Sequence, residues 1–152
     1  MSSSEATAPP LPPALTLWPG YLLAFIAEHG TERFERRIGV HGITSRHAAI
    51  LVVIDSEGPM SQRALGRRLR IDKSPMVGLV DDLERAELAQ RRRSPSDRRI
   101  QALHLTPMGR TVLARVQEIA DAEQARTFGV LDVAERTLLH DLLLRVAEAV
   151  PD

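Results

Sequence analysis

Cysteine is absent from the 152 residues, which excludes disulfides, thiolate metal sites and thiol-based peroxide sensing. Aromatic residues make up only 3% of the chain, so we expect an aliphatic core. No apolar run reaches the roughly 18 residues that a membrane-spanning helix needs. The segment Met1 to Pro13 lacks the basic start and hydrophobic centre of a signal peptide, and we expect a disordered tail and a cytoplasmic protein.

Catalytic signatures are also missing from the sequence. It contains no Gly-x-Ser-x-Gly, no phosphate-binding loop and no dinucleotide-binding glycine pattern. The histidines do not form His-x-x-x-His or His-Glu-x-x-His pairs; they are His29, His41, His47, His104 and His140. We therefore predict that the protein is not an enzyme and uses no cofactor and no metal.

The net charge of zero conceals an uneven distribution of charge along the chain. Residues 1–60 carry a net charge of −2, residues 61–99 carry +5, and residues 100–152 carry −3. A basic segment can be an ordinary solvated surface, but it is also the feature that phosphate binding requires.

The basic segment begins with two helical patterns. Ser61 can cap a helix that runs to about Leu69, and Asp72 or Ser74 can cap the next helix, with Pro75 in its first turn. The second pattern has apolar residues at helical spacing, namely Met76, Leu79, Val80 and Leu83. Two short helices joined by a tight turn resemble a helix-turn-helix, whose second helix enters the DNA major groove.

A basic hairpin follows the two helices. Residues 88–92 and 100–105 read as strands, and Arg92 to Arg99 between them reads Arg-Arg-Ser-Pro-Ser-Asp-Arg-Arg. A helix-turn-helix followed by such a hairpin is a winged helix, and arginine at the tip suits the minor groove.

Residues 43–113 resemble the MarR (multiple antibiotic resistance regulator) family of bacterial transcription factors. The matching motifs are Ile43-Thr44, Gly58-Pro59-Met60-Ser61-Gln62-Arg63-Ala64-Leu65, Ile71-Asp72-Lys73-Ser74, Leu79-Val80-Asp81-Asp82-Leu83-Glu84, Ser94-Pro95-Ser96-Asp97-Arg98-Arg99 and Leu105-Thr106-Pro107-Met108-Gly109. The wing sequence together with Leu-Thr-Pro-x-Gly is the most specific of these motifs.

The resemblance implies a set of DNA contacts. They are Ser61, Gln62, Arg63, Lys73, Ser74, Pro75, Val77, Gly78, Arg91, Asp97, Arg98 and Arg99. Family members often carry threonine at position 77 and arginine or another polar residue at positions 78 and 82, whereas this chain has Val77, Gly78 and Asp82. We therefore expect the wing to contribute more affinity than the second helix.

The flanking segments are expected to be helical and to form a dimer. We predict a tail at 1–14, a dimerisation helix in 15–42, the winged helix-turn-helix at 43–105 and further dimerisation helices in 106–152. The last helix is expected to bury an apolar stripe against the first; the stripe consists of Leu138, Leu139, Leu142, Leu143, Val146 and Ala147. A monomeric core built from the same helices is the alternative. The fold class is mainly α with a small β wing.

These features predict a homodimeric DNA-binding transcriptional regulator, a repressor acting on a pseudo-palindromic operator. The resemblance also implies release by a small aromatic or phenolic ligand. The residues expected to surround that ligand are Trp18, Tyr21, Arg37, His41 and His47. The alternative function is a winged helix that binds another protein without specific DNA readout; the +5 segment argues against it.

Overall fold

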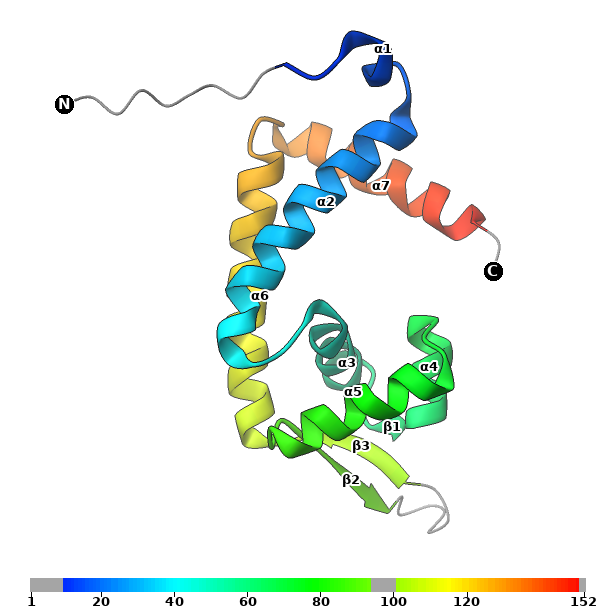
Figure 1. The fold of residues 1–152 in the computed structure, drawn as a ribbon, viewed down its shortest axis with the longest axis vertical. Helices are drawn as coiled ribbons and strands as arrows, with labels where there is room; N and C mark the ends of the chain where they lie inside the picture. The colour runs from blue at the N-terminus through cyan, green and yellow to red at the C-terminus, as the bar shows by residue number, and fades with distance from the viewer. Residues whose placement is uncertain (1–9, 94–100, 151–152) are drawn as a thin grey trace, which may run out of the picture.

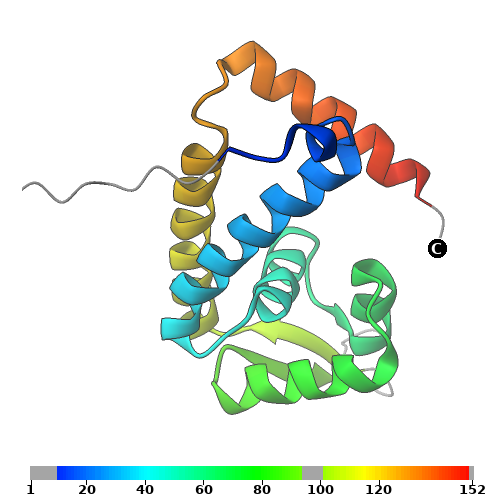
Figure 2. The ribbon, with the colours of Figure 1, turned by 45° about the horizontal axis from the view of Figure 1, so that its top comes forward.

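The computed structural model describes residues 10–93 and 101–150 (Figure 1). One end of the molecule holds three shorter helices and a small sheet, and the other end holds long helices contributed by both halves of the chain (Figures 1 and 2). The long helix that follows the sheet, α6 (Pro107–Phe128), runs from one end to the other and packs along the long N-terminal helix α2 (Pro19–Ile38). The sequence therefore predicted the fold class correctly.

The N-terminal segment forms α1 (Pro13–Thr16) and α2 (Pro19–Ile38). Each helix has proline in its first turn, where the missing N–H costs no helical hydrogen bond. The sequence placed residues 13 and 14 in the tail, but they begin α1; residues 1–9 of that tail lie outside the described part of the chain. A short 3₁₀ helix, η1 (Gly39–His41), follows, and Gly42 adopts φ 71°, which ends this segment.

Three helices come next, and the second and third of them form the predicted helix-turn-helix. They are α3 (Ser45–Ser56), α4 (Gln62–Leu69) and α5 (Lys73–Arg85). Ser61 caps α4 as predicted, because its hydroxyl accepts a hydrogen bond from the Ala64 N–H at 3.2 Å. Asp72 occupies the capping position of α5, although its side chain accepts no capping hydrogen bond within the described region.

A three-stranded antiparallel sheet completes this end of the molecule. Its strands are β1 (Met60–Ser61), β2 (Ala89–Arg93) and β3 (Gln101–Leu105), in the order β1-β3-β2. The bounds of the two hairpin strands were predicted to within one residue. Residue 100, the predicted start of the second strand, lies outside the described residues. Strand β1 was not predicted, because a two-residue strand carries no period of its own and exists only by pairing with β3.

The core is aliphatic, as the composition predicted. It joins the end of α2, α3, α4, α5, the sheet and part of α6 (Pro107–Phe128). Its fully buried side chains include Ile38, Ile50, Leu51, Leu65, Met76, Val80, Leu83 and Leu103. Leu79 packs against this cluster only in part. The face of α5 that was predicted to be apolar is buried in this core, so the opposite face of the helix is available to a partner.

The last helix, α7 (Val133–Ala149), begins with a capping box formed by Asp132 and Glu135. Among its described residues none is buried within the single chain. The predicted stripe is therefore not packed on α2 of the same chain: Leu138 is 60% exposed and Leu142 is 45% exposed. In the described part of the chain, no helix is both long and apolar enough to cross a membrane.

Candidate nucleic-acid interface

The turn between α4 and α5 holds the two helices close together. Arg70 takes the left-handed conformation with φ 51°, and the Ile71 N–H donates to the Gly66 carbonyl at 2.9 Å. An added Cβ on Gly66 would lie 2.9 Å from the Ile71 carbonyl oxygen, so this close turn requires a glycine at position 66.

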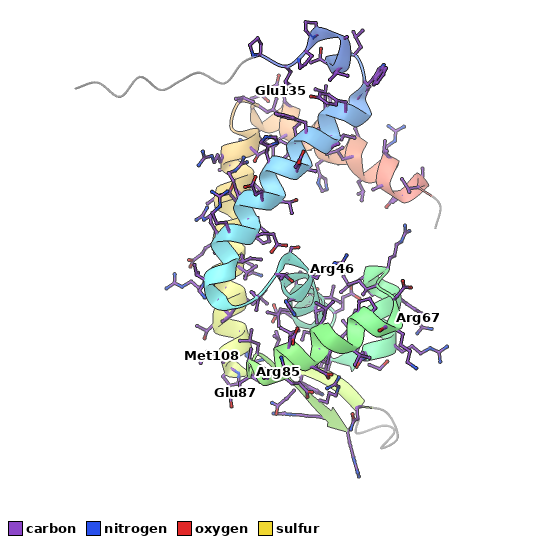
Figure 3. The ribbon with its side chains drawn as sticks, in the orientation of Figure 1. Arg46, Arg67, Arg85, Glu87, Met108 and Glu135 are labelled. Atoms are coloured by element: carbon purple, nitrogen blue, oxygen red, sulfur yellow. The ribbon has the colours of Figure 1, made fainter. Side chains whose placement is uncertain are left out.

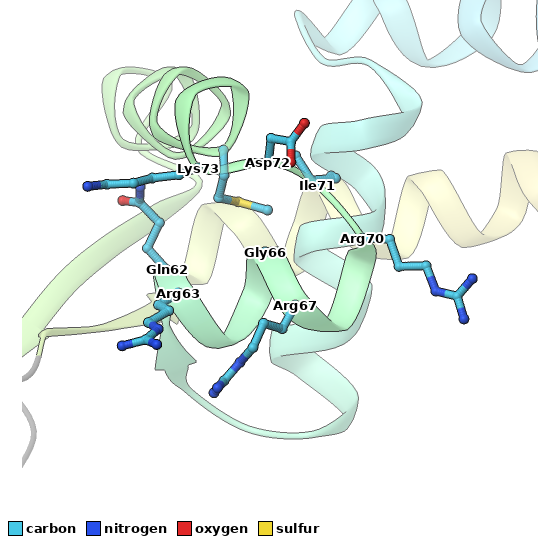
Figure 4. A pocket seen from close by; sticks show the side chains of 9 residues that line it. Gln62, Arg63, Gly66, Arg67, Arg70, Ile71, Asp72 and Lys73 are labelled. Carbon is cyan, nitrogen blue, oxygen red and sulfur yellow. The ribbon is translucent and has the colours of Figure 1, made fainter. Parts of the chain in front are cut away.

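An open groove of 1350 Å³ runs between α4 and α5 (Figure 4). Four cations line it, together with a single carboxylate; the cations are Arg63, Arg67, Arg70 and Lys73, and the carboxylate belongs to Asp72. Arg63 and Arg67 leave the same side of α4 (Figure 4), and Arg67 projects from the surface at this end of the molecule (Figure 3). The charged residues that line the groove thus carry a net charge of +3, which is part of the excess positive charge seen in the sequence.

The outer face of α5 is exposed beside this groove. It carries the predicted contact residues Lys73, Ser74, Pro75, Val77 and Gly78. Val77 is 37% exposed, and an added Cβ on Gly78 would meet no described atom within 4 Å. This face is therefore smooth and weakly polar apart from its first turn.

Several neighbouring charges are already paired. Arg85 donates to Asp82 at 2.6 Å, and this hydrogen bond lowers the pKa of the Asp82 carboxyl. Arg68 forms a similar pair with Glu57, with a shortest separation of 2.7 Å. Since Asp82 is paired, its charge opposes phosphate less than the sequence alone suggested.

Arg91 behaves differently from the other predicted contacts. Its guanidinium turns back toward α5 and donates to Asp81 at 2.7 Å, and its pair with Glu84 is closer still. The remaining wing residues of the predicted site are Asp97, Arg98 and Arg99, and these three lie outside the described residues.

A separate pocket of 370 Å³ lies between α2 and α6. Its lining is largely apolar with a few polar groups; it consists of Ile26, Ala27, Gly30, Thr31, Phe34, Ser45, Ala120, Glu123, Gln124, Thr127 and Phe128. Glu123 is 8% exposed and binds two arginines of α2: Arg33 at 2.9 Å and Arg37 at 3.0 Å. These hydrogen bonds, that of Arg33 first, lower the pKa of the Glu123 carboxyl.

The five residues predicted to surround a ligand do not line this pocket. Trp18 is 64% exposed, Tyr21 stacks toward Phe25, and His41 lies at the end of η1. Arg37 does not line the pocket, but it pairs with Glu123, which does.

His47 is buried, and it caps α3 instead of facing the pocket. Its Nδ1 accepts the Thr44 backbone N–H at 3.1 Å, while its Nε2 lies 3.6 Å from an Asp82 carboxylate oxygen on α5. Among the described residues, no group of three or more His, Asp or Glu side chains forms a metal site.

Residues 41–100 match the family model described as MarR family; this range covers the helix-turn-helix and strand β2 and ends just before strand β3. The chain belongs to the MarR family. The family resemblance found from sequence motifs is thereby confirmed.

Relatives of this MarR-family chain include a "putative transcriptional regulatory protein for hcr operon" of Thauera aromatica, 36% identical over 105 residues. That match covers 69% of this chain and 63% of the relative, so the chain spans less than two thirds of the relative's length. A "probable transcriptional regulator" of Pseudomonas aeruginosa, solved by crystallography, is 30% identical; the match covers 87% of this chain and 98% of that one, with a TM-score of 0.76.

CouR is a third relative and has been solved in two complexes. CouR of Rhodococcus jostii RHA1 with p-coumaroyl-CoA is 26% identical, with coverage of 93% and 99% and a TM-score of 0.79. The transcriptional repressor CouR on a 23-mer DNA duplex is 29% identical, with coverage of 89% and 96% and a TM-score of 0.79.

Sequence reasoning missed the residues that build the pocket in this MarR-family chain, above all Glu123. A signal was present: Arg33 and Arg37 are four residues apart and share one side of a helix. The acid that would pair with both of them lies 86 to 90 residues away, and no local pattern selects it among the other acids of α6.

Proposed function

We propose that this protein is a homodimeric, DNA-binding transcriptional repressor that recognises a pseudo-palindromic operator. The observation that carries the proposal is the groove between α4 and α5, in which four cations lie beside an exposed helix face. Phosphate binding requires such a concentration of positive charge. CouR, which has the same fold, is named a repressor and was solved on duplex DNA.

The proposed contacts divide into two groups. Arg63 and Lys73 neutralise phosphates at the start of α4 and α5, and Val77 and Gly78 allow α5 to approach base edges closely. The wing arginines predicted from the sequence, Arg98 and Arg99, complete the site in the minor groove.

The proposal includes a division of the chain into parts. Residues 43–105 form the winged helix-turn-helix that binds DNA, and the helices on either side of it form the dimer.

The first test selects an operator from a random DNA pool with the purified protein and titrates it across a salt series. We expect two half-sites about one helical turn apart (~10 bp). Lys73→Gln should lower the slope of log affinity against log salt by about 1.8, because each subunit of the dimer loses one phosphate contact and each contact contributes about 0.9. Arg126→Gln, on an exposed part of α6, is the matched control and should leave both affinity and slope unchanged.

Two results would count against the proposal. Selection of a single asymmetric half-site would contradict binding as a two-fold dimer. Failure to select any sequence above non-specific binding would favour the alternative, a winged helix that binds another protein.

We further propose that the pocket between α2 and α6 binds a small aromatic ligand that releases DNA. A volume of 370 Å³ suits a single aromatic ring system, since small-molecule pockets run from about 300 to 1,000 Å³. The polar groups of Thr31, Ser45 and Gln124 can fix its orientation. Titration of aromatic acids and their CoA thioesters into the operator complex, with release of DNA as the readout, tests this part.

A further inference from the structure

Arg91 joins three elements of the winged helix. Its Nη2 donates to Asp81 Oδ1 at 2.7 Å and to Gln62 Oε1 at 3.0 Å, and its Nη1 pairs with Glu84. Its own backbone N–H donates to Glu84 Oε1 at 2.7 Å. One side chain from strand β2 is thus bound to both helices of the helix-turn-helix.

The position of Arg91 in the sheet explains why it reaches the helices. It pairs in register with Leu103 of β3, which is 2% exposed, and Ala89 on the same side of β2 is 2% exposed. The Arg91 side chain therefore continues the row that faces α5 and is 25% exposed.

The guanidinium of Arg91 is poorly suited to bind a phosphate, because its hydrogen bonds and its charge are already used by neighbouring residues. Burial opposes its charge, but the hydrogen bond to Asp81 and the charges of Glu84 and Asp81 outweigh it, so the pKa of Arg91 is raised. The three charged groups together carry a net −1. A phosphate contact would require Arg91 to leave two carboxylates unpaired beside the polyanion, which costs more than an exposed arginine would gain.

We propose that Arg91 is a positioning residue, which fixes strand β2 of the wing against α4 and α5 without contacting DNA itself. DNA binding then depends on Arg91 because the wing and the recognition helix must reach two grooves at once. The inference rests on the proposed function, since it concerns how the same surface is presented to DNA, and it replaces the role that the sequence motif implied for Arg91.

The test compares four proteins on the selected operator across a salt series: the wild type, Arg91→Gln, Arg91→Lys and the triple variant Arg91→Gln/Asp81→Asn/Glu84→Gln. We expect Arg91→Gln to weaken binding about tenfold, the scale of a lost charge-assisted hydrogen bond, with an unchanged salt slope. The triple variant leaves no unpaired carboxylate and should recover most of the affinity.

Arg91→Lys separates positioning from phosphate binding. Lysine keeps the charge but cannot bridge two carboxylates and an amide with one planar group, so we expect a loss similar to that of Arg91→Gln. A phosphate contact would instead tolerate lysine. Thermal unfolding of each variant identifies any that does not fold. If Arg91→Gln does not fold, the triple variant takes its place in the test: the inference then requires that the triple variant folds and binds the operator with the wild-type slope of log affinity against log salt.

Three results would overturn the inference. They are a salt slope reduced by about 1.8 in Arg91→Gln (about 0.9 for each subunit of the dimer), full affinity in Arg91→Lys, or no recovery in the triple variant. If the wild type selects no operator, the proposed function fails and the inference fails with it. A wild type that binds while any of the three results appears refutes the inference alone.

Discussion

At the scale of the residue, Gly109 shows how little space separates the wing from α6. It lies in the first turn of α6 and is buried, and its N–H donates to the Thr106 hydroxyl oxygen at 2.9 Å. An added Cβ would lie 1.9 Å from the Leu88 carbonyl oxygen. That carbonyl already accepts the Thr106 backbone N–H at 3.1 Å, so it cannot move away without losing this bond.

We expect Gly109→Ala to reduce the free energy of unfolding by about 1–3 kcal/mol or more, because the clash falls on backbone. Gly78→Ala is the matched control, since no described atom lies within 4 Å of its added Cβ; it should raise stability by up to about 1 kcal/mol through helix propensity. Chemical denaturation of both variants measures the effect. Equal stabilities would show that α6 can shift away from Leu88 without cost.

At the scale of the element, the sequence revealed helix boundaries well, because capping is local chemistry. Ser61 begins α4 as predicted, and Thr106 with Pro107 and Asp132 with Glu135 begin α6 and α7 by the same local chemistry. Strand β1 was missed because its pairing partner, β3, lies more than 40 residues away. The same limit applies to the site: the groove residues follow a recognisable motif, whereas the partners of Arg91 and Arg37 depend on tertiary contacts that no spacing encodes.

The contact between α2 and α6 depends on one buried carboxylate. Glu123 accepts hydrogen bonds from Arg33 and Arg37, and Arg33 also donates to the Thr127 hydroxyl at 3.0 Å. Because the pKa of Glu123 is lowered on folding, its contribution to stability is present above its ordinary value of 4.5 and is lost as the pH falls through the lowered value.

We expect Glu123→Gln to be less stable than the wild type at pH 7, since two guanidiniums lose their shared anion. The difference between the two proteins should shrink as the pH falls from 4.5 through the lowered pKa of Glu123, where the carboxyl of the folded wild type becomes protonated. Thermal unfolding from pH 7 to pH 3 measures it, with the exposed Glu118→Gln of the same helix as control. A difference that stays constant with pH would show that the ion pairs contribute nothing.

At the scale of the whole molecule, the exposed apolar surface gathers at the end opposite the winged helix. It spans α7 and the N-terminal helices and includes Leu17, Trp18, Leu23, Ile26, Leu138, Leu142 and Val146, which are 41% to 77% exposed. Figures 1 and 2 show α7 extending away from the body of the chain past the end of α2. Patches of this kind mark association surfaces, and interleaving with a second copy would cover the side of α7 that carries Leu138, Leu142 and Val146.

The structure separates two faces of the predicted stripe. Leu139 and Leu143 line a pocket of 390 Å³ against α6 of the same chain, so charges there would disturb the single chain as well. Leu138 and Leu142 lie one turn apart and are exposed, which makes them the better probes of dimerisation.

We expect Leu138→Glu with Leu142→Glu to yield a monomer at micromolar concentration in sedimentation analysis and to abolish operator binding, because each half-site contact alone is too weak to persist. Thr137→Glu with Leu144→Glu adds the same charge on another side of the helix and should remain dimeric. A monomeric variant that still binds the full operator with wild-type affinity would refute the dimer as the DNA-binding unit. Loss of binding by a variant that stays dimeric would instead mean that α7 acts on the winged helix within one chain.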